Sequence, residues 1–343
     1  MSARRRLRRI FGDRGVGVRG TGVRDERGMA LLAALFAVAL LTVIVVEMTD
    51  ATLVHTHLTR NAGNAMAAQL LARSAEVAGE ALITSDDTND PDVTCPNGLW
   101  AAPIIGVPVG PGVVGLQITD EGGKLDLNAV GDARYRAAVQ ELFSLLGLDP
   151  DLVDRIAAWI ASPSSGSPMA TGEASDYCAL PMPCEPRQRP MSTLEELLLI
   201  RGFDEQTLRV LRPYVTVIPR TEQQRSSGPL QPVNLNTADW RVLRALGCDV
   251  GESDAPPACP SFPTDEQEQT WRNEVEEWKK QKCAGARREW LGTKSNLYSI
   301  RASGTVGDVT QVLRTTVQRS GGRARRLWWQ ERPVADVMPV EIS

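Results

Sequence analysis

The sequence predicts an α+β protein. A long N-terminal helix leads to a small antiparallel sheet, and a large all-α domain is inserted into that sheet. Three observations predict this fold: residues 29–83 are helix-forming and free of proline, strand-like segments occur early and late in the chain, and a long helical block separates them. A helical block between two groups of strands is expected to be an insertion within one sheet.

The expected segments follow one another without overlap. They are a basic leader (1–28), a long helix (29–83), a first β region (84–131), an α-helical inserted domain (132–290), closing strands (291–320) and a basic, flexible tail (321–343).

The N-terminal segment combines a basic leader with an apolar run. Nine arginines lie within the first 28 residues, and residues 29–46 contain Thr42 as their only polar side chain. This run is about the minimum length for a transmembrane helix, and the arginines before it predict a cytoplasmic N-terminus. A secretory signal peptide would have a shorter apolar core and a small-x-small cleavage site. The segment is therefore expected to be a single-pass anchor.

The helix is expected to continue beyond the anchor. From Met48 to Leu82, apolar residues recur every three or four positions, which is typical of an amphipathic helix. A helix over residues 29–83 would be roughly 80 Å long at ~1.5 Å per residue. Its second half is expected to lie under the soluble domain.

Strands are predicted on both sides of the helical block. Residues 113–119 and 124–127 read as two strands joined by a turn at 121–123, and the segment NLYSIRASGTVGDVTQVLRTTVQR as two alternating strands joined at 304–308. The basic tail, RSGGRARRLWWQERP, could touch a membrane surface or a neighbouring subunit.

Two asparagine-rich segments are expected to cap helices, because Asn and Thr before an apolar-periodic run satisfy the first backbone N–H groups. In NLNTADWRVLRAL, Asn236 or Thr237 would cap the helix that carries Trp240, with Asn234 opening the motif. Asn128 has the same place before the first helix of the block.

The six cysteines indicate disulfide bonds. No pair has CxxC spacing and only two histidines are present, which argues against a zinc site. Cys178 and Cys184 bracket one proline-rich loop, and Cys248 and Cys259 bracket another, so these four are disulfide candidates for an oxidising compartment. Six cysteines allow about fifteen pairings, and the sequence does not choose among them.

Charge and motifs exclude several classes of function. The net charge is −4 at pH 7 although the leader is basic, so the body is acidic, which argues against general nucleic-acid binding. GxSxG, P-loop, GxGxxG and HExxH motifs are absent, and His55 and His57 are two apart and so on different faces of a helix. No enzymatic activity is predicted.

Calcium is the one ion that the sequence suggests, because acidic loops supply oxygen ligands. Glu173 and Asp176 lie in such a loop after Trp159. The alternative is an ordinary solvated acidic loop.

Two hairpins, at residues 146–149 and 201–204, could belong to helix-hairpin-helix DNA-binding elements. Each has an aspartate directly after the turn, Asp149 and Asp204, where phosphate would be repelled.

The leader and first helix resemble those of type IV pilin and pseudopilin precursors. The resemblance implies that a prepilin peptidase cuts after Gly28 and methylates the new N-terminus at Met29. Most members carry Glu five residues into the mature chain, where this chain has Ala33. Lack of this Glu is typical of the type II secretion minor pseudopilin K family, whose members lie at the filament tip.

The remaining chain is similar to the same family. Its members have a pilin fold interrupted by an α-helical domain, with an NLN motif before the insertion and a second asparagine-rich motif within it. Here the first motif reads Asp126-Leu127-Asn128, a departure from NLN, and the second starts at Asn234. Relatives carry two carboxylates after Trp-Ile in the calcium loop, and this chain lacks both after Ile160.

The resemblance implies a non-enzymatic minor pseudopilin that initiates or caps the periplasmic pseudopilus during export of folded proteins. Expected partners are I- and J-type minor pseudopilins docked on the amphipathic half of the long helix, the major pseudopilin below, the prepilin peptidase and the bacterial inner membrane, with no nucleic acid. The N-terminus would be cytoplasmic and the body periplasmic. The alternatives are an anchored helix-hairpin-helix DNA-binding protein and a plain anchored periplasmic domain.

Overall fold

The structure is a computed structural model that describes residues 23–86, 93–161, 188–220, 224, 228–259 and 264–332. It confirms the predicted α+β class, with a long helix, an antiparallel sheet and further helices. In chain order the elements are α1 (Val23–Asp86), β1 (Ile104–Val109), β2 (Gly112–Asp120), β3 (Leu125–Asp126), η1 (Leu127–Ala129), α2 (Ala133–Leu145), α3 (Asp151–Ile160), η3 (Leu194–Leu199), α5 (Glu205–Leu211), β4 (Val215–Thr216), β5 (Val233–Asn234), α6 (Trp240–Ala245), α7 (Asp265–Lys282), η5 (Arg288–Trp290), β6 (Leu291–Gly292), β7 (Leu297–Val306), β8 (Val309–Ser320) and β9 (Arg323–Arg332).

α1 is one continuous helix of 64 residues. It begins at Val23, before the helix start expected at Met29, and continues to Asp86. The chain forms two compact units whose boundary lies inside α1, after Gly63. The sheet and the inserted domain both belong to the second unit, which begins at Asn64.

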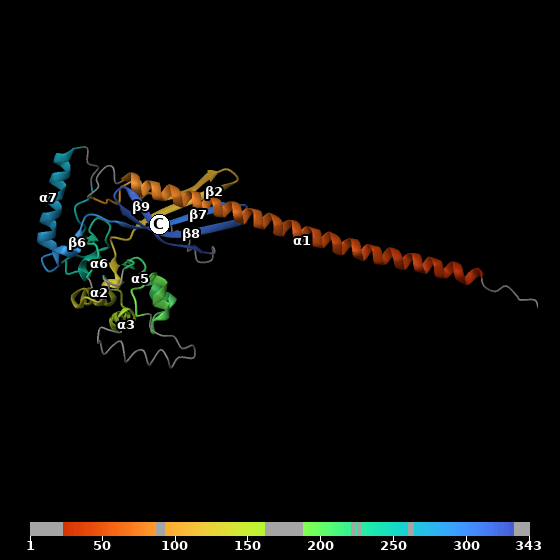
Figure 1. The fold of residues 1–343 in the computed structure, drawn as a ribbon, viewed down its shortest axis with the longest axis horizontal. Helices are drawn as coiled ribbons and strands as arrows, with labels where there is room; N and C mark the ends of the chain where they lie inside the picture. The colour runs from red at the N-terminus through yellow and green to blue at the C-terminus, as the bar shows by residue number, and fades with distance from the viewer. Residues whose placement is uncertain are drawn as a thin grey trace, which may run out of the picture. The chain divides into compact units, whose positions relative to one another are not determined.

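The main sheet is antiparallel, with strand order β1-β2-β7-β8-β9 (Figure 1). β2 and β7 are neighbours, and the last residue of β2, Asp120, lies opposite Tyr298 near the start of β7. The chain therefore leaves the sheet and returns to it at the same strand ends, which makes the intervening helical domain an insertion.

The expected hairpin between 113–119 and 124–127 is wrong. β2 covers the first segment, but β3 (Leu125–Asp126) pairs in parallel with β4 (Val215–Thr216) inside the inserted domain. β2 pairs with β7 through residues 113–120 and with β1 through residues 112–116. The chain after Asp120 does not turn back onto β2 and passes into the helical domain instead.

The expectation that residues 321–343 form a flexible tail is wrong for the first part of this segment. Arg323–Arg332 forms β9, which pairs antiparallel with β8. Gly321 and Gly322 both have positive φ in the intervening turn, as two-residue hairpin turns require. Residues 333–343 lie outside the described part of the chain.

Small residues let α1 lie close to the sheet. Ala68, Ala72 and Ala75 are buried on the helix face that meets the strands. Directly below, Gly304 of β7 has no room for a side chain, because a Cβ there would overlap the backbone of Ala68 and Ala72. The core beneath α1 is completed by Ile83, Trp100, Leu116, Ile118, Tyr298, Ile300, Ala302, Leu313 and Val317.

The inserted domain has its own core. Its largest fully buried side chains include Tyr135, Phe143, Ile156, Leu197 and Leu211. They come from α2, α3, η3 and α5, and the cores of this domain and of the sheet form separate clusters. The connection between the two therefore depends on polar contacts and on a disulfide.

Candidate functional site

The residues expected at the processing site lie on α1. Gly28, Met29 and Ala33 are exposed positions of this helix. Within the described residues, α1 contains the one segment long and apolar enough to cross a membrane, and none of its most apolar window is buried. The helix fits a single-pass membrane anchor.

The first asparagine motif does not cap a helix but connects distant segments of the chain through buried hydrogen bonds. The amide of Asn128 donates to the carbonyl oxygens of Met191 and Ile218, each at 2.9 Å, and its oxygen accepts the Met191 N–H at 2.8 Å. The first helical turn beyond is capped by Asp126, whose carboxylate accepts the Asn128 N–H. Asn128 thus joins chain segments that lie 63 and 90 residues apart from it.

Asp126 explains how DLN can replace NLN. Its carboxylate binds Arg220 at 2.6 Å, and the two side chains are 3% and 0% exposed. The same carboxylate accepts the N–H groups of Asn128 and Ile218. A buried charge is tolerated only when it is paired and hydrogen-bonded, and Arg220 supplies the paired charge.

The second motif repeats this geometry. The side-chain oxygen of Asn234 accepts the Asn236 N–H, just as Asp126 accepts the N–H of Asn128. Each motif begins in a two-residue parallel ladder, β3 with β4 or β5 with β6. The expected caps are wrong here, because Asp239 caps α6 through the Arg241 N–H.

Instead of capping α6, the second motif connects the inserted domain to the sheet. The Asn234 amide donates to Asp120 at 2.9 Å, and the Thr237 hydroxyl donates to the same carboxylate at 2.5 Å. Asn236 donates to the carbonyl oxygens of Thr94 and Thr293.

Asp120 receives these donors at the end of β2. It also accepts the Gly122 N–H at 2.7 Å. Burial raises the pKa of Asp120 above its usual value of 3.8, and hydrogen bonds from Ser295, Thr237, Asn234 and Gly122 oppose that shift without cancelling it. No sequence motif marks Asp120, and only its place at a strand end next to a glycine turn singles it out.

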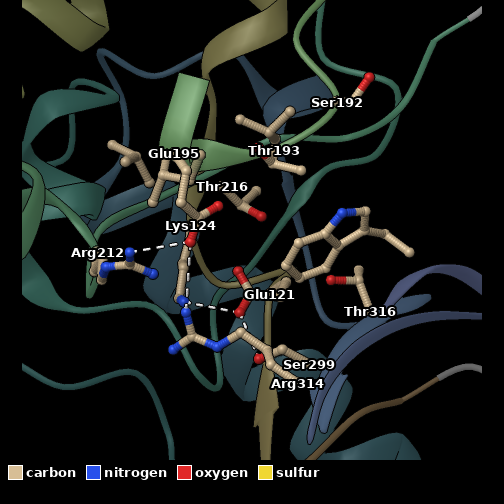
Figure 2. A pocket seen from close by; sticks show the side chains of 14 residues that line it. Glu121, Lys124, Ser192, Thr193, Glu195, Arg212, Thr216, Ser299, Arg314 and Thr316 are labelled. Carbon is tan, nitrogen blue, oxygen red and sulfur yellow. Dashed lines mark hydrogen bonds and ion pairs between the residues drawn. The ribbon is translucent and has the colours of Figure 1, made fainter. Parts of the chain in front are cut away.

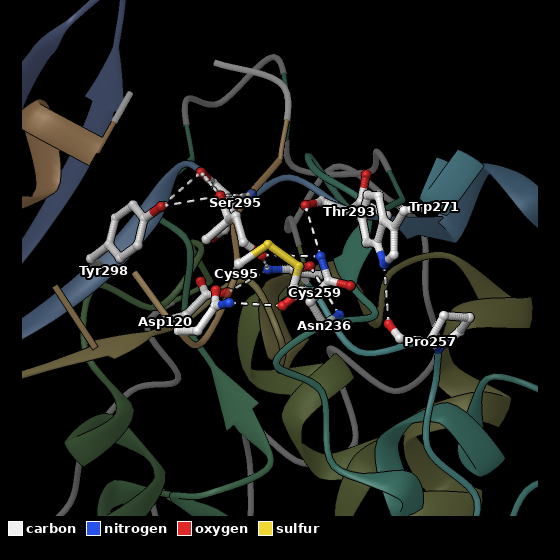
Figure 3. The surroundings of a disulfide bond; sticks show 12 residues. Cys95, Asp120, Asn236, Pro257, Cys259, Trp271, Thr293, Ser295 and Tyr298 are labelled. Atoms are coloured by element: carbon white, nitrogen blue, oxygen red, sulfur yellow. Dashed lines mark hydrogen bonds between the residues drawn. A yellow bond between two sulfur atoms is a disulfide. The ribbon is translucent and has the colours of Figure 1, made fainter. Parts of the chain in front are cut away.

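A second buried group adjoins Asp120. Arg319 of β8 donates to Thr94 and to the carbonyl oxygen of Ser295, and its guanidinium lies 5.3 Å from the centre of the Tyr298 ring. Thr94 in turn accepts the Ser295 N–H. We refer to Thr94, Asp120, Asn234, Asn236, Thr237, Ser295, Tyr298 and Arg319 as the polar junction. Figure 3 labels Asp120, Asn236, Ser295 and Tyr298 of this set.

A disulfide lies beside the polar junction. Cys95 bonds Cys259 of the inserted domain, and Figure 3 places it among Asp120, Asn236 and Ser295. Cys248 bonds Cys283. Cys248 and Cys259 are thus both disulfide-bonded, as expected, but each pairs with a more distant cysteine and not across the loop between them.

A polar pocket lies where the sheet faces the inserted domain (Figure 2). Lys124 pairs with Glu121 at 3.0 Å, while Arg212 and Arg314 lie 3.0 and 3.9 Å from Glu195. Burial alone would raise the pKa of Glu121, but the Lys124 charge and hydrogen bonds from Ser299, Lys124 and Thr216 outweigh it and lower the pKa. The pocket lining thus has three cationic and two anionic side chains, and each carboxylate is paired within the pocket.

The remaining sequence candidates are not brought together. Glu173, Asp176, Cys178 and Cys184 lie outside the described residues. Among the residues that the structure describes, no group of three or more His, Cys, Asp or Glu side chains could hold a metal.

The two hairpin aspartates occupy the helix starts that phosphate would need. Asp204 accepts the Thr207 N–H at 2.7 Å, and this backbone hydrogen bond lowers the pKa of Asp204. Asp149 accepts the Asp151 N–H. Both turns therefore present a carboxylate where a DNA phosphate would have to bind.

Comparisons with known proteins agree with this architecture. The family model for the type II secretion system (T2SS), protein K, matches residues 123–220. The type II secretion system protein K of Pectobacterium carotovorum subsp. carotovorum is 30% identical over 215 residues, an alignment that covers 57% of this chain and 63% of that relative.

The fold is also found in a solved structure. A chain of the GspK-GspI-GspJ complex from the enterotoxigenic Escherichia coli type 2 secretion system matches with a TM-score of 0.61 and 19% identity, over 81% of this chain and 99% of that one. The family match starts at the turn before Asp126 and includes Asn128 and its partners Met191 and Ile218. The chain is thus similar to type II secretion system protein K, and it spans less than two thirds of the length of that curated relative.

Proposed function

We propose that this protein is a minor pseudopilin that initiates or caps the tip of the periplasmic pseudopilus. The position of the inserted domain carries the proposal. The β7–β8 turn at Gly307 lies beside Asn64, whereas the inserted domain leaves the sheet at Asp120, and nearby Arg319 donates to the Ile83 carbonyl near the end of α1.

The added volume is thus at the end of the sheet where α1 terminates. A subunit stacked beyond that end would overlap the domain, whereas a tip subunit has none beyond it. Inside a filament, the same volume would prevent stacking.

Ala33 supports the tip position. A carboxylate in the apolar part of α1 would cost at least ~2.5–3.5 kcal/mol unless a cationic partner lay beside it. A subunit at the tip has no subunit ahead of it to provide the terminal ammonium. Alanine at this position removes the cost.

The anchor would lie in the bacterial inner membrane with the N-terminus in the cytoplasm. The arginine-rich leader favours this orientation. The two disulfides support a body on the oxidising, periplasmic side, because disulfides persist in oxidising compartments.

Processing at Gly28 is the first test. The full chain is co-expressed with a prepilin peptidase, and its intact mass and N-terminal sequence are measured. A chain that begins at Met29 with one added methyl group supports the pseudopilin role. A chain that still begins at Met1 contradicts it and favours a plain anchored periplasmic domain.

Partners would be the I- and J-type minor pseudopilins, as in the complex of the structural relative, with the major pseudopilin below. Co-purification of the processed chain with these subunits tests the assembly. Loss of pseudopilus formation in the absence of this chain, restored by its return, tests the initiating role.

The proposed role is that of a structural component without catalysis. Calcium in the acidic loop of Glu173 and Asp176 is a separate proposal. Calorimetric titration with calcium is expected to show binding that Asp176→Asn abolishes. Equal heats for the variant and the parent chain would remove this site.

A further inference from the structure

The polar pocket between the sheet and the inserted domain has no role in the proposed function (Figure 2). It lies on the face of the sheet opposite α1. Ser299, Thr316 and Trp328 of its lining lie side by side in register on β7, β8 and β9. The residues that alternate with them, such as Ile300 and Val317, point into the core beneath α1. Contacts made by α1 therefore leave the pocket accessible.

Positive charge exceeds negative charge in the pocket lining. Lys124 pairs with Glu121 at 3.0 Å, whereas Arg212 and Arg314 share the carboxylate of Glu195, at 3.0 and 3.9 Å. The side chains of Arg314 and Glu195 are 34% and 25% exposed, so the site is partly enclosed and still open to solvent. An excess of one sign of charge in a partly enclosed site attracts the opposite charge. The pocket should therefore attract an anion.

The strand beside the pocket adds another positive charge. Arg301 of β7 lies directly opposite Arg314 of β8 in the antiparallel register. Both residues alternate to the same face of the sheet as Ser299 and Thr316. Like charges in directly opposite positions destabilise a sheet. An anion bound beside Arg314 would offset this repulsion.

The size of the pocket limits the ligand. Its cavity volume of about 90 Å³ is well below the roughly 300–1,000 Å³ of pockets that enclose a drug-sized molecule. The pocket can accept the charged end of a side chain or of a peptide.

The lining favours a carboxylate over other anions. The planar guanidinium group of arginine binds a carboxylate through two parallel hydrogen bonds. Trp328 supplies an apolar wall for the carbon atoms next to the carboxylate. A phosphate dianion would be repelled by Glu121 and Glu195, which also line the pocket.

We propose that the polar pocket binds a carboxylate of another protein, presented by an acidic side chain or by a free C-terminus. Arg314 pairs with the carboxylate, the Thr316 hydroxyl donates a hydrogen bond to it, and Trp328 covers its carbon stem. The inference goes beyond the proposed function and does not depend on it, because α1 takes no part in the site.

Tryptophan NMR on the full chain in detergent micelles tests the site. The chain contains eight tryptophans, so isotope labelling of their indole N–H groups gives few signals, and Trp328→Phe and Trp329→Phe assign the two of interest. The probes are acetyl-Ala-Glu-Ala-amide, acetyl-Ala-Ala with a free C-terminus, and the uncharged acetyl-Ala-Gln-Ala-amide. A saturable shift of the Trp328 signal is expected with a carboxylate probe. Trp329 should not respond, because it lies opposite Thr315 on the face of the sheet toward α1.

The probes separate the two sources of the carboxylate. A response to the glutamate probe alone would identify an acidic side chain as the ligand, and a response to the free-terminus probe alone would identify a C-terminus. No response to either would overturn the proposal, as would an equal response to the glutamine probe. A response to inorganic phosphate but to neither carboxylate probe would overturn the assigned ligand.

Charge substitution gives an independent readout. Arg314→Gln should weaken binding of the carboxylate probe about tenfold, because it removes a charged hydrogen-bond donor. Arg209→Gln is the matched control, since Arg209 is exposed on α5 outside the pocket lining. Thr316→Glu keeps every ion pair and should abolish binding, because its own carboxylate occupies the site. Circular dichroism should show the parent fold, and parent affinity in both pocket variants would overturn the site.

Discussion

At the scale of single residues, the stability of the inserted domain depends on buried polar pairs. Asp126 and Arg220 are almost fully enclosed, and each neutralises the other's charge. Asn128 and Asn234 are also fully buried and fully engaged through backbone or carboxylate partners. Polar groups in such surroundings cost little when satisfied and much when one partner is lost.

Removing the Arg220 guanidinium should therefore strongly reduce the stability of the protein. Arg220→Met leaves the Asp126 carboxylate buried without its counter-charge, and the free energy of unfolding should fall by about 3–5 kcal/mol. Asp126→Asn combined with Arg220→Met, which recreates NLN, should recover part of that loss. Urea denaturation of both variants measures the coupling. Additive effects of the two changes would contradict a paired role.

Glu121 should make stability depend on pH. Its pKa is lowered in the folded protein from the usual 4.5, so its stabilising contribution is present at neutral pH and is lost as the pH falls through the folded-state pKa. The contribution of Asp120 to the pH dependence has the opposite sign. Burial raises its pKa, so deprotonation of Asp120 disfavours the folded state.

Glu121→Gln should reduce the loss of stability between pH 7 and acid relative to the parent chain. Denaturation midpoints across this range test the prediction. A larger acid-induced loss in the variant than in the parent would show that Glu121 is not the group that is stabilised when charged.

At the scale of elements, α1 and the sheet approach each other through small residues. Gly304 of β7 contacts the backbone of α1, whereas Gly63 has open space around it. Substitutions at the two glycines can therefore be compared, because Gly304 is in a packed contact and Gly63 is exposed in a helix.

Gly304→Ala should destabilise the protein by about 1–3 kcal/mol, because the added methyl group forces α1 away from the strands. Gly63→Ala should be neutral or stabilising by up to ~1 kcal/mol through helix propensity. Thermal unfolding followed by circular dichroism compares them. Equal midpoints for the two variants would mean that the close approach is not required.

At the scale of the whole molecule, the inserted domain and the sheet have separate cores joined by the polar junction and by Cys95–Cys259. Cys248–Cys283, by contrast, closes a loop within the inserted domain. The first disulfide should therefore control how the two parts are held together, and the second only local stability.

Replacing Cys95 and Cys259 by Ala should lower stability by about 2–4 kcal/mol and increase hydrogen exchange around Asn234 and Thr94. Replacing Cys248 and Cys283 by Ala should leave exchange at the junction unchanged. Mass-spectrometric hydrogen exchange on both double variants provides the measurement. Greater exposure of the junction in the second variant would contradict this division.

Local patterns in the sequence determined the anchor, the long helix, the strand alternation and the order in which helices follow strands, because each depends on neighbours within a few residues. The resemblance at Gly28, Ala33 and the asparagine motifs led from these patterns to the family. The β9 hairpin also had a local signal, in Gly321-Gly322, which the expectation of a flexible tail overlooked.

Tertiary structure alone decided the partners of side chains distant in sequence. From the sequence, Asn128 could cap a helix or connect distant segments. Only the approach of Met191 and Ile218 in the fold shows that it connects them. The disulfide pairing and the Asp126–Arg220 pair likewise depend on segments that meet only after folding. The exposed face of α1 was decided in the same way. The spacing of apolar residues along a helix does not say which apolar face packs on the core and which remains exposed, and packing against the sheet made that choice.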